Sequence, residues 1–425
     1  MLTGIDNPMA ATDSQLKTDL EESFDPFIEP YLTDPYRFFT EARTATPVFY
    51  SRKLDYWVVT RYHDIRAILP NTKQFSVAEA LSVVRPICPK GVQVFSAAGF
   101  DVLPTLANND PPSHTRIRRL ANFALSATHL AEIESFIRET TVQCVSERFV
   151  SCRADLVREL TFDLPALVIF RLLGIPDEDA PLLKPTLEAR ILPFWGRSSE
   201  DEQLRVAQWM AKSWEYTQQF VAARAREPRD DFTSALLQAR LPDLIALSEH
   251  EVRSLVFGLL VAAHETTTSL LTNGFRRILT DRASWEAICH DPALIANAIE
   301  EILRMDPSIV AWRRKTKEPV EIAGRLVPAN ATLLLLLGSA NRDPEVFEEP
   351  DTFSIRRPNA KDHLSFGYGA HFCLGAFLAR LEARVVFEEV SSRMPTLRLV
   401  GGQEVHFLPN TFFRAPLSLL VEWNA

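Results

Sequence analysis

Residues 366–375 read Phe366-Gly-Tyr-Gly-Ala-His-Phe-Cys373-Leu-Gly375, and the segment Ala376–Arg393 that follows is rich in strong helix formers. Three of the chain's 14 glycines fall within these ten residues, and glycine permits positive φ and close backbone approach. A cysteine at a helix N-terminus meets unpaired N–H groups and partial positive charge. Both lower the pKa of a thiol and favour the thiolate, which is the form that binds metals. Cys373 is therefore a candidate metal ligand, and the alternative is a buried structural cysteine on a turn.

The composition of the chain excludes several classes of protein. Its 425 residues carry 46 basic and 55 acidic side chains, a net charge of −9 that argues against nucleic acid or an anionic membrane surface as a partner. Five cysteines form no Cys-x-x-Cys pair, which fits a reducing cytoplasm rather than a disulfide framework or a zinc ribbon. No signal peptide is visible, and the longest apolar stretches are shorter than the roughly 18 residues of a membrane span. We expect a cytoplasmic protein that binds no membrane.

Helical periodicity dominates the chain up to residue 305, and strand-like segments become frequent after it. A capping box, Ser248-x-x-Glu251, opens the longest helical pattern, which continues for about 32 residues, or roughly 48 Å at 1.5 Å per residue. We expect helices at residues 63–69, 114–125, 130–149, 155–173, 248–279, 293–305 and 376–393, with further helical segments within 177–230. We expect strands at residues 56–60, 320–322, 326–327, 331–337, 397–400, 405–408 and 418–421.

The region between residues 76 and 112 holds five prolines among many apolar side chains, and we expect an irregular loop that forms a lid or a pocket wall. No linker or repeat divides the chain. Separation of helices from strands argues against a regular alternation of strand and helix. The predicted fold is therefore mainly α with a smaller β portion, in a single domain at residues 25–425 that follows a loose leader at residues 1–24.

The segment around the cysteine resembles the haem-binding signature Phe-x-x-Gly-x-x-x-Cys-x-Gly of the cytochrome P450 family. All four fixed positions match, at Phe366, Gly369, Cys373 and Gly375. The resemblance implies the single-domain cytochrome P450 fold, with residues 25–425 as a haem-binding monooxygenase domain. It also implies haem b (iron protoporphyrin IX) as cofactor and Cys373 as the axial thiolate ligand of its iron.

A second motif precedes this signature in the expected order. Glu301-Ile-Leu-Arg304 resembles the Glu-x-x-Arg of the family, and at i, i+3 its two side chains share one helix face. In the family the pair is structural and is locked by a downstream arginine, for which Arg356 and Arg357 are equal candidates. Apart from the resemblance, Glu301 and Arg304 would be an ordinary surface pair.

A third motif, Ala262-Ala-His-Glu265-Thr266, lies in the middle of the long helical pattern and resembles the oxygen-binding groove of the family. The resemblance places Ala262 against the haem and implies that Glu265 and Thr266 relay protons to dioxygen. Ala263 stands where glycine is typical, which would narrow the groove. The alternative is a solvated helix face. A zinc-protease motif is excluded, because the second histidine that it needs is replaced by a threonine.

Four basic residues are implied ligands of the haem propionates. His114 and Arg118, at i, i+4, resemble the family pair that binds a propionate from one helix face. By resemblance Arg314 and His371 would hold the propionates as well. Apart from the resemblance, all four would be ordinary exposed basic residues.

The substrate pocket is expected to be largely apolar. Each candidate wall residue could equally be part of the packed core. The candidate walls are Ala263, Val310, Ala311, Phe412 or Phe413, and the segments Ser82–Leu106 and Ile191–Trp195.

The resemblance implies a monooxygenase that activates dioxygen and inserts one oxygen atom into a small-to-medium apolar organic substrate, by hydroxylation or dealkylation. No flavin, nicotinamide or iron–sulfur module is recognisable. Electrons are therefore expected from a ferredoxin and ferredoxin reductase or a similar donor, or from a fused part beyond this sequence. A basic patch containing Arg380 and Arg384 is the candidate dock for an acidic ferredoxin. Residues 409–416 loosely resemble herbicide-degrading and reductase-fused bacterial members.

Two other functions remain open at this point. The first is a peroxygenase on the same fold, which would use hydrogen peroxide without redox partners, although the acid–alcohol pair Glu265-Thr266 argues against it. The second is a non-catalytic haem protein such as a gas sensor, in which a proton-relay pair would have no purpose.

Overall fold

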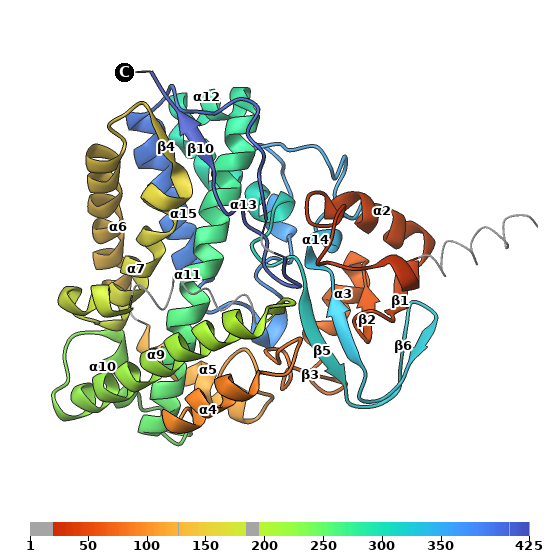
Figure 1. The fold of residues 1–425 in the computed structure, drawn as a ribbon, viewed down its shortest axis with the longest axis vertical. Helices are drawn as coiled ribbons and strands as arrows, with labels where there is room; N and C mark the ends of the chain where they lie inside the picture. Colours follow the sequence, from red (N-terminus) through yellow and green to blue (C-terminus); the bar gives the residue numbers. More distant parts are fainter. Residues whose placement is uncertain (1–19, 126, 184–194, 408, 425) are drawn as a thin grey trace, which may run out of the picture.

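The structure, a computed structural model, describes residues 20–125, 127–183, 195–407 and 409–424. Its longest helix is α11 (Glu249–Thr280), which runs through the helical part of the molecule (Figure 1). The predicted capping box is confirmed, because the Ser248 hydroxyl accepts the Glu251 N–H at 3.2 Å and the Glu251 carboxylate accepts the Ser248 N–H at 2.9 Å. The helices α7 (Asp163–Leu173), α9 (Glu200–Arg226) and α13 (Ile295–Met305) pack against it.

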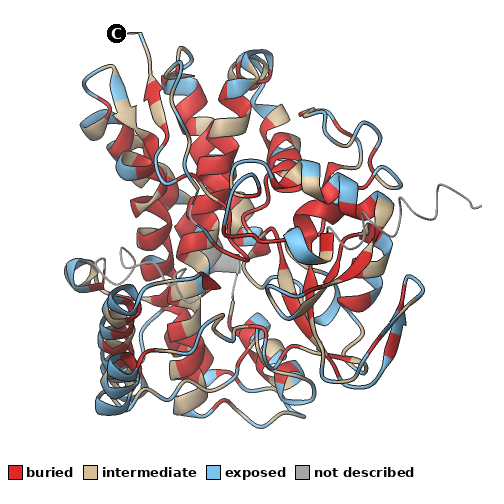
Figure 2. Ribbon diagram, turned by 45° about the vertical axis from the view of Figure 1, so that its right-hand side comes forward, coloured by how far each residue is buried: buried red, intermediate tan, exposed pale blue. Residues whose placement is uncertain are grey.

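By length and composition α11 is the one helix among the described residues that could cross a membrane. However, 67% of its most apolar 18-residue window is buried inside the fold, as in a core helix. Figure 2 shows the same helix as a mostly buried element. Its hydrophobicity therefore serves packing.

The remaining helices surround α11 or cover the sheet, and short 3₁₀ turns join several of them. The other α-helices are α2 (Pro35–Ala45), α3 (Tyr62–Ile68), α4 (Pro89–Ala97), α5 (Ser113–Ala124), α6 (Ala127–Arg148), α10 (Phe232–Gln238), α12 (Arg282–His290), α14 (Leu337–Ala340) and α15 (Ala376–Arg393). The strands are β1 (Val48–Ser51), β2 (Tyr56–Val59), β3 (Phe75–Ser76), β4 (Arg153–Asp155), β5 (Trp312–Thr316), β6 (Val320–Ile322), β7 (Arg325–Val327), β8 (Thr332–Leu335), β9 (Arg398–Leu399) and β10 (Leu420–Glu422).

The largest sheet lies to one side of the helical part (Figure 1) and has the strand order β1-β2-β8-β5-β3. Its pairs are antiparallel except for β2 with β8. In β5, Arg313 stands opposite Leu334 and Arg314 stands opposite Leu333. Because successive side chains of a strand point to opposite faces, the two arginines lie on opposite faces of the sheet.

Three apolar clusters form the core of the described residues. The largest joins α6, α7, α11, α13 and α15. The second contains Leu333 and Leu335 from one face of the five-stranded sheet, and the third contains Val58 and Leu334 from the other. The mainly α fold with a smaller β portion, predicted from the sequence, is thereby confirmed.

Several predicted elements differ from the observed ones. Residues 155–173 form the end of β4, a π-helix (Val157–Thr161) and α7, because the Asp155 carboxylate accepts the N–H groups of Val157 and Leu419 and ties the segment to the C-terminal strand. The predicted loop at 76–112 contains α4, which Pro89 initiates, since its fixed φ suits the first helical turn. Residues 405–407 make only an isolated bridge to Pro416, which has no N–H to extend a ladder.

The last residues of the predicted leader, from Leu20 onward, are among the described residues. Leu20 and Phe24 are buried in the third apolar cluster, so packing begins before residue 25. Residues 1–19 of the predicted leader lie outside the described residues.

Candidate functional site

One face of α11 is uncovered at the middle of the helix. Ala262 is exposed, and Gly258, Leu259, Ala263 and Thr266 are partly exposed, whereas most residues of the helix are buried. Their three- and four-residue spacing places them on one face. The small side chains of the predicted oxygen groove therefore border space that protein atoms do not fill.

The two predicted proton-relay residues occupy different environments on this helix. Thr266 borders the uncovered face, and its hydroxyl donates to the Ala262 carbonyl at 2.7 Å. The Ser308 hydroxyl donates to the Thr266 carbonyl at 2.8 Å and holds this turn from outside the helix. Glu265 is only 5% exposed, so this stretch is not a solvated helix face. Its neighbour His264 is fully buried and contacts the Phe162 carbonyl at 2.8 Å.

The cysteine loop is held in a fixed conformation by its own backbone. The Cys373 N–H donates to the Phe366 carbonyl at 2.9 Å. Gly369 has φ +78°, and a Cβ there would lie 2.6 Å from the Pro70 Cβ, so the position requires glycine. The Ala376 N–H, at the start of α15, donates to the Cys373 carbonyl at 3.4 Å, and the amides of Gly375 and Ala376 favour the thiolate form of the Cys373 sulfur.

Burial raises the pKa of the Cys373 thiol, whereas the two amides and the guanidiniums of Arg118 and Arg380 lower it. The lower pKa expected from the helix terminus alone is therefore wrong for the protein without a metal ion, since burial outweighs it. The side chain is nevertheless exposed by area. Cys373 is thus surrounded by protein atoms but not covered by them, so its side chain borders a space inside the fold. A metal ion at that sulfur would stabilise the thiolate directly.

Four basic residues, which the sequence analysis names as propionate ligands, converge beside this loop. The rings of His114 and His371 lie 3.9 Å apart between centroids. Arg118 donates to the Phe372 carbonyl at 2.6 Å, and Arg314 donates to the Arg313 carbonyl at 2.9 Å. His371 Nδ1 contacts the Leu106 carbonyl at 3.2 Å, which joins the cysteine loop to the segment before α5.

Among the described residues, no carboxylate forms an ion pair with any of these four. Both ring nitrogens of His114 and the Nε2 of His371 are buried without a hydrogen-bond partner. Burial, followed by His371 and Arg118, lowers the pKa of His114 to about 4. Burial lowers the pKa of Arg314 to about 10. The carboxylate of Asp110 acts on His114, Arg314 and His371 but forms its ion pair with Lys317, at 3.1 Å. The cluster can therefore bind a further anion. The two propionates of a haem held by Cys373 would fit it.

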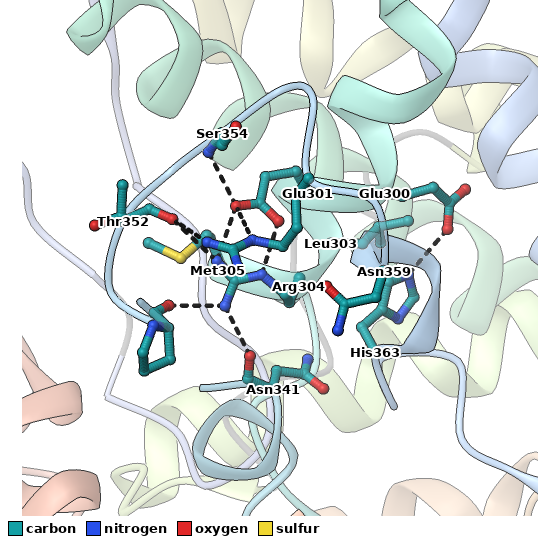
Figure 3. Close-up of polar contacts among 12 residues, drawn as sticks. Glu300, Glu301, Leu303, Arg304, Met305, Asn341, Thr352, Ser354, Asn359 and His363 are labelled. Carbon is teal, nitrogen blue, oxygen red and sulfur yellow. Dashed lines mark hydrogen bonds and ion pairs between the residues drawn. The ribbon is translucent and has the colours of Figure 1, made fainter. Parts of the chain in front are cut away.

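The Glu-x-x-Arg pair is buried, and it is not the surface pair that spacing alone would suggest (Figure 3). Both side chains of Glu301 and Arg304 are 0% exposed, and they form two contacts of 2.7 and 2.8 Å. Arg357 is the third member, with its Nε 3.0 Å from Glu301 Oε1, whereas Arg356 is exposed. The Ser354 N–H donates to the same oxygen at 3.0 Å. The open choice between the two arginines is thereby resolved.

The predicted substrate walls expose little surface. Val310, Ala311 and Phe413 are 3%, 0% and 9% exposed, and they pack in or beside the apolar clusters. Trp195 is buried as well, and residues 191–194 lie outside the described residues. Their contact with substrate stays a prediction.

The two predicted cations of the ferredoxin dock are engaged within the protein. Arg380 contacts Glu300 at 2.6 and 2.9 Å and stacks on Phe366. Arg384 contacts Glu134 at 2.9 Å and Glu388 at 2.8 Å. Each charge is therefore partly neutralised, which weakens this pair as an attractor for an acidic partner.

The sequence analysis missed two residues that lie next to predicted site residues. Ser308, which fastens the turn of Thr266, gave no signal, because a serine after a proline is common in turns. Arg313 lies beside the predicted propionate ligand Arg314 and is equally buried. Two successive arginines in a strand that reaches the core would have been a usable signal, since the pleat sends one to each face.

Comparisons with known proteins agree with this geometry. The Cytochrome P450 family model matches residues 277–393. Cytochrome P450 107B1 of Saccharopolyspora erythraea is 34% identical over 355 residues, which cover 83% of this chain and 85% of that protein. The structure of cytochrome P450 CREJ in complex with (4-ethylphenyl) dihydrogen phosphate has a TM-score of 0.90 and 36% identity, over 95% of this chain and all of that one.

A third similar protein is an intact type IV self-sufficient cytochrome P450 monooxygenase. Its structure has a TM-score of 0.90 and 37% identity, and the match covers 95% of this chain but 53% of that one. The predicted likeness to reductase-fused bacterial proteins is confirmed by this match.

Proposed function

The chain belongs to the cytochrome P450 family, and from that premise we propose that it inserts one oxygen atom of dioxygen into a small-to-medium organic substrate, by hydroxylation or dealkylation. Membership itself makes the protein a haem-thiolate monooxygenase with haem b as its cofactor. The proposal concerns the kind of substrate, the source of electrons and the roles of individual residues.

The haem, when bound, supplies the redox chemistry that activates dioxygen. Cys373 would hold its iron, and the amides of Gly375 and Ala376 would stabilise the negative charge on the sulfur. His114, Arg118, Arg314 and His371 would bind the propionates. The observation that carries the proposal is a cluster of two arginines and two histidines beside an accessible thiol, none of them ion-paired with a carboxylate of the described residues.

Thr266 and Glu265 would supply protons to the uncovered face of α11. The Thr266 hydroxyl donates its hydrogen bond to the Ala262 carbonyl, so the hydroxyl oxygen would act as an acceptor for a hydrogen bond in the groove. Glu265, one residue earlier, is a buried acid that would exchange protons with Thr266 Oγ1. Ala262 and Ala263 would leave room for dioxygen and substrate beside the helix.

The electrons would come from a ferredoxin and its reductase, in the cytoplasm. A reductase fused to the same polypeptide is the other source, because the similar self-sufficient protein is about twice as long as the matched part. Substrates of one or two rings are reasonable first candidates, since the cytochrome P450 CREJ structure holds a single-ring aromatic compound.

Isotope labelling tests the proposal. The holoenzyme would be supplied with heavy-oxygen-labelled dioxygen, NADPH, a ferredoxin, a ferredoxin reductase and a compound that shifts its Soret band. We expect a product that carries one labelled oxygen atom. A product formed with hydrogen peroxide but not with the redox partners would favour the peroxygenase, and no product from either system would favour the haem sensor.

A further inference from the structure

Arg313 is a second buried guanidinium on β5, and it points away from the face that holds Arg314. It is 3% exposed. Its Nη1 donates to the Tyr56 hydroxyl at 3.0 Å, and its Nη2 donates to the Ser82 carbonyl. The guanidinium carbon lies 4.6 Å from the centre of the Phe412 ring. The Nε is buried and has no hydrogen-bond partner.

No carboxylate within the described part of the chain forms an ion pair with Arg313, and this distinguishes it from four other buried arginines. Arg304, Arg357, Arg224 and Arg342 are each paired with a carboxylate. Among carboxylates, Glu79 acts electrostatically on Arg313. Its side chain is about half exposed and forms an ion pair with Lys315.

Two further buried arginines also lack a direct ion pair, but each has a buried carboxylate close by. Asp343 acts on Arg43, and Asp306 acts on Arg414. Both aspartates are less than 5% exposed. Arg313 and Arg314 therefore stand apart, as buried cations without a buried counter-charge. A buried cation of this kind is costly unless an anion joins it. For Arg314 the proposed function assigns the haem propionate as that anion.

The surroundings of Arg313 place it where three of the predicted pocket walls meet. Ser82 is the first residue of the candidate wall Ser82–Leu106, Phe412 is itself a candidate wall residue, and Trp195 is the last residue of the candidate wall Ile191–Trp195. Trp195 packs on Phe412 at 5.6 Å between ring centroids and donates its Nε1 to the Leu81 carbonyl at 3.4 Å. Ser82 is exposed and Tyr56 is half-buried, so two contacts of the buried guanidinium lie near the protein surface.

We propose that Arg313, assisted by the Tyr56 hydroxyl, binds an anionic oxygen group of the substrate, a carboxylate or a phosphate monoester. The inference rests on the proposed function and narrows its substrate to an apolar body with one anionic substituent. A guanidinium suits this role, because its planar N–H donors match the oxygens of carboxylate and phosphate. The anion would take the free Nε–H and would supply the missing counter-charge.

Isothermal titration calorimetry on the holoenzyme tests this directly, with three probes of one shape. These are 4-butylbenzoate, 4-butylphenyl phosphate and the neutral 4-butylbenzamide. We expect the wild type to bind one or both anions more tightly than the amide. In Arg313→Gln the Kd of the preferred anion should rise by about 10- to 100-fold, while that of the amide stays within about twofold, since a hydrogen bond to a charged group contributes roughly 1.5–3 kcal/mol. The anion with the lower Kd shows whether Arg313 prefers a carboxylate or a phosphate monoester.

Arg356→Gln is the matched control, because it removes an exposed arginine far along the chain from β5 and should leave all three Kd values unchanged. Arg313→Lys keeps the charge and should retain part of the preference, and it replaces the glutamine variant if that variant does not fold. Equal binding of anion and amide by the wild type would overturn the proposal. An equal loss of all three probes in the variant would overturn it too, because that result describes a purely structural arginine.

Calorimetry separates this inference from the proposed function. Binding is measured without turnover, so a failure to form product with any redox system would count against monooxygenation of these compounds alone. An anion preference that depends on Arg313 would still stand.

Discussion

The imidazole rings of His114 and His371 lie 3.9 Å apart, and within the described residues neither ring forms an ion pair with a carboxylate. One comes from the first turn of α5 and the other from the loop before Cys373. Burial lowers the pKa of both rings, so they contact one another as neutral groups at neutral pH. Together with Arg118 and Arg314 they form a preorganised anion site beside the thiol.

Removing one cation of that site should weaken haem retention. In Arg118→Gln we expect haem to transfer to excess apomyoglobin about 10-fold faster than from the wild type, because a charged hydrogen bond to a propionate is lost. The neighbouring Arg119→Gln is the control, since Arg119 pairs with Asp243 on the surface. Equal transfer rates for the two variants would remove Arg118 from the propionate site.

The buried Glu301 network predicts a large difference between two adjacent arginines. Arg357→Gln should lower the free energy of unfolding by about 3–5 kcal/mol, because it leaves part of a buried charge network unpaired. Arg356→Gln removes an exposed side chain and should change it by less than about 0.5 kcal/mol. Urea denaturation followed by circular dichroism would measure both values. Similar losses in the two variants would contradict the assignment.

These two arginines also show what sequence can and cannot predict. Local patterns sufficed for the Ser248 capping box and for α15, whose residues 376–393 form the predicted helix. The sequence could not decide between Arg356 and Arg357. They are adjacent residues in an irregular turn, and local sequence does not determine which of the two side chains points toward Glu301. The Glu300 partner of Arg380 lies 80 residues away and has no local signature.

The candidate site divides in the same way. Cys373 and Gly369 could be predicted because one short segment contains the ligand and the turn that presents it. The burial that raises the pKa of the thiol comes from packing, which local sequence does not describe. Arg313 was missed for a related reason, since its missing counter-charge is visible only once every neighbouring segment is in place.

Thr266→Ala should uncouple electron consumption from oxygenation. Without the hydroxyl that is bonded to the Ala262 carbonyl, product formation should fall by about 10- to 100-fold while NADPH oxidation continues and hydrogen peroxide accumulates. Thr266→Ser keeps the hydroxyl and should stay close to the wild type. The measurement is the ratio of product and peroxide to NADPH consumed. An unchanged ratio in the alanine variant would show that Thr266 has no part in proton delivery.

Glu382, in α15, predicts a pH dependence of stability. The side chain is 2% exposed, its Oε1 has no hydrogen-bond partner, and burial raises the pKa of the carboxyl from 4.5 to about 8. Between pH 4.5 and 8 the Glu382 carboxyl is therefore protonated in the folded state and ionised in the unfolded state. The contribution of Glu382 to the free energy of unfolding is largest below pH 4.5. It decreases as the pH rises to about 8, by at most about 1.4 kcal/mol per pH unit.

Glu382→Gln should remove that slope and make the protein more stable than the wild type at pH 8. The measurement is the free energy of urea unfolding at several pH values between 5 and 8, with Glu132→Gln, an exposed glutamate, as the control. A wild type and a Glu382 variant with parallel pH profiles would show that the carboxyl is already ionised in the folded protein.

The absorption spectrum of the reduced carbon monoxide complex tests the assignment of Cys373 most directly. The wild-type holoenzyme should show the strongly red-shifted Soret band that thiolate ligation gives to haem. In Cys373→Ser that band should disappear, with haem either lost or bound with an unshifted Soret band. A serine variant that keeps the red-shifted band would show that another residue ligates the iron, and the account of the cysteine loop would be wrong.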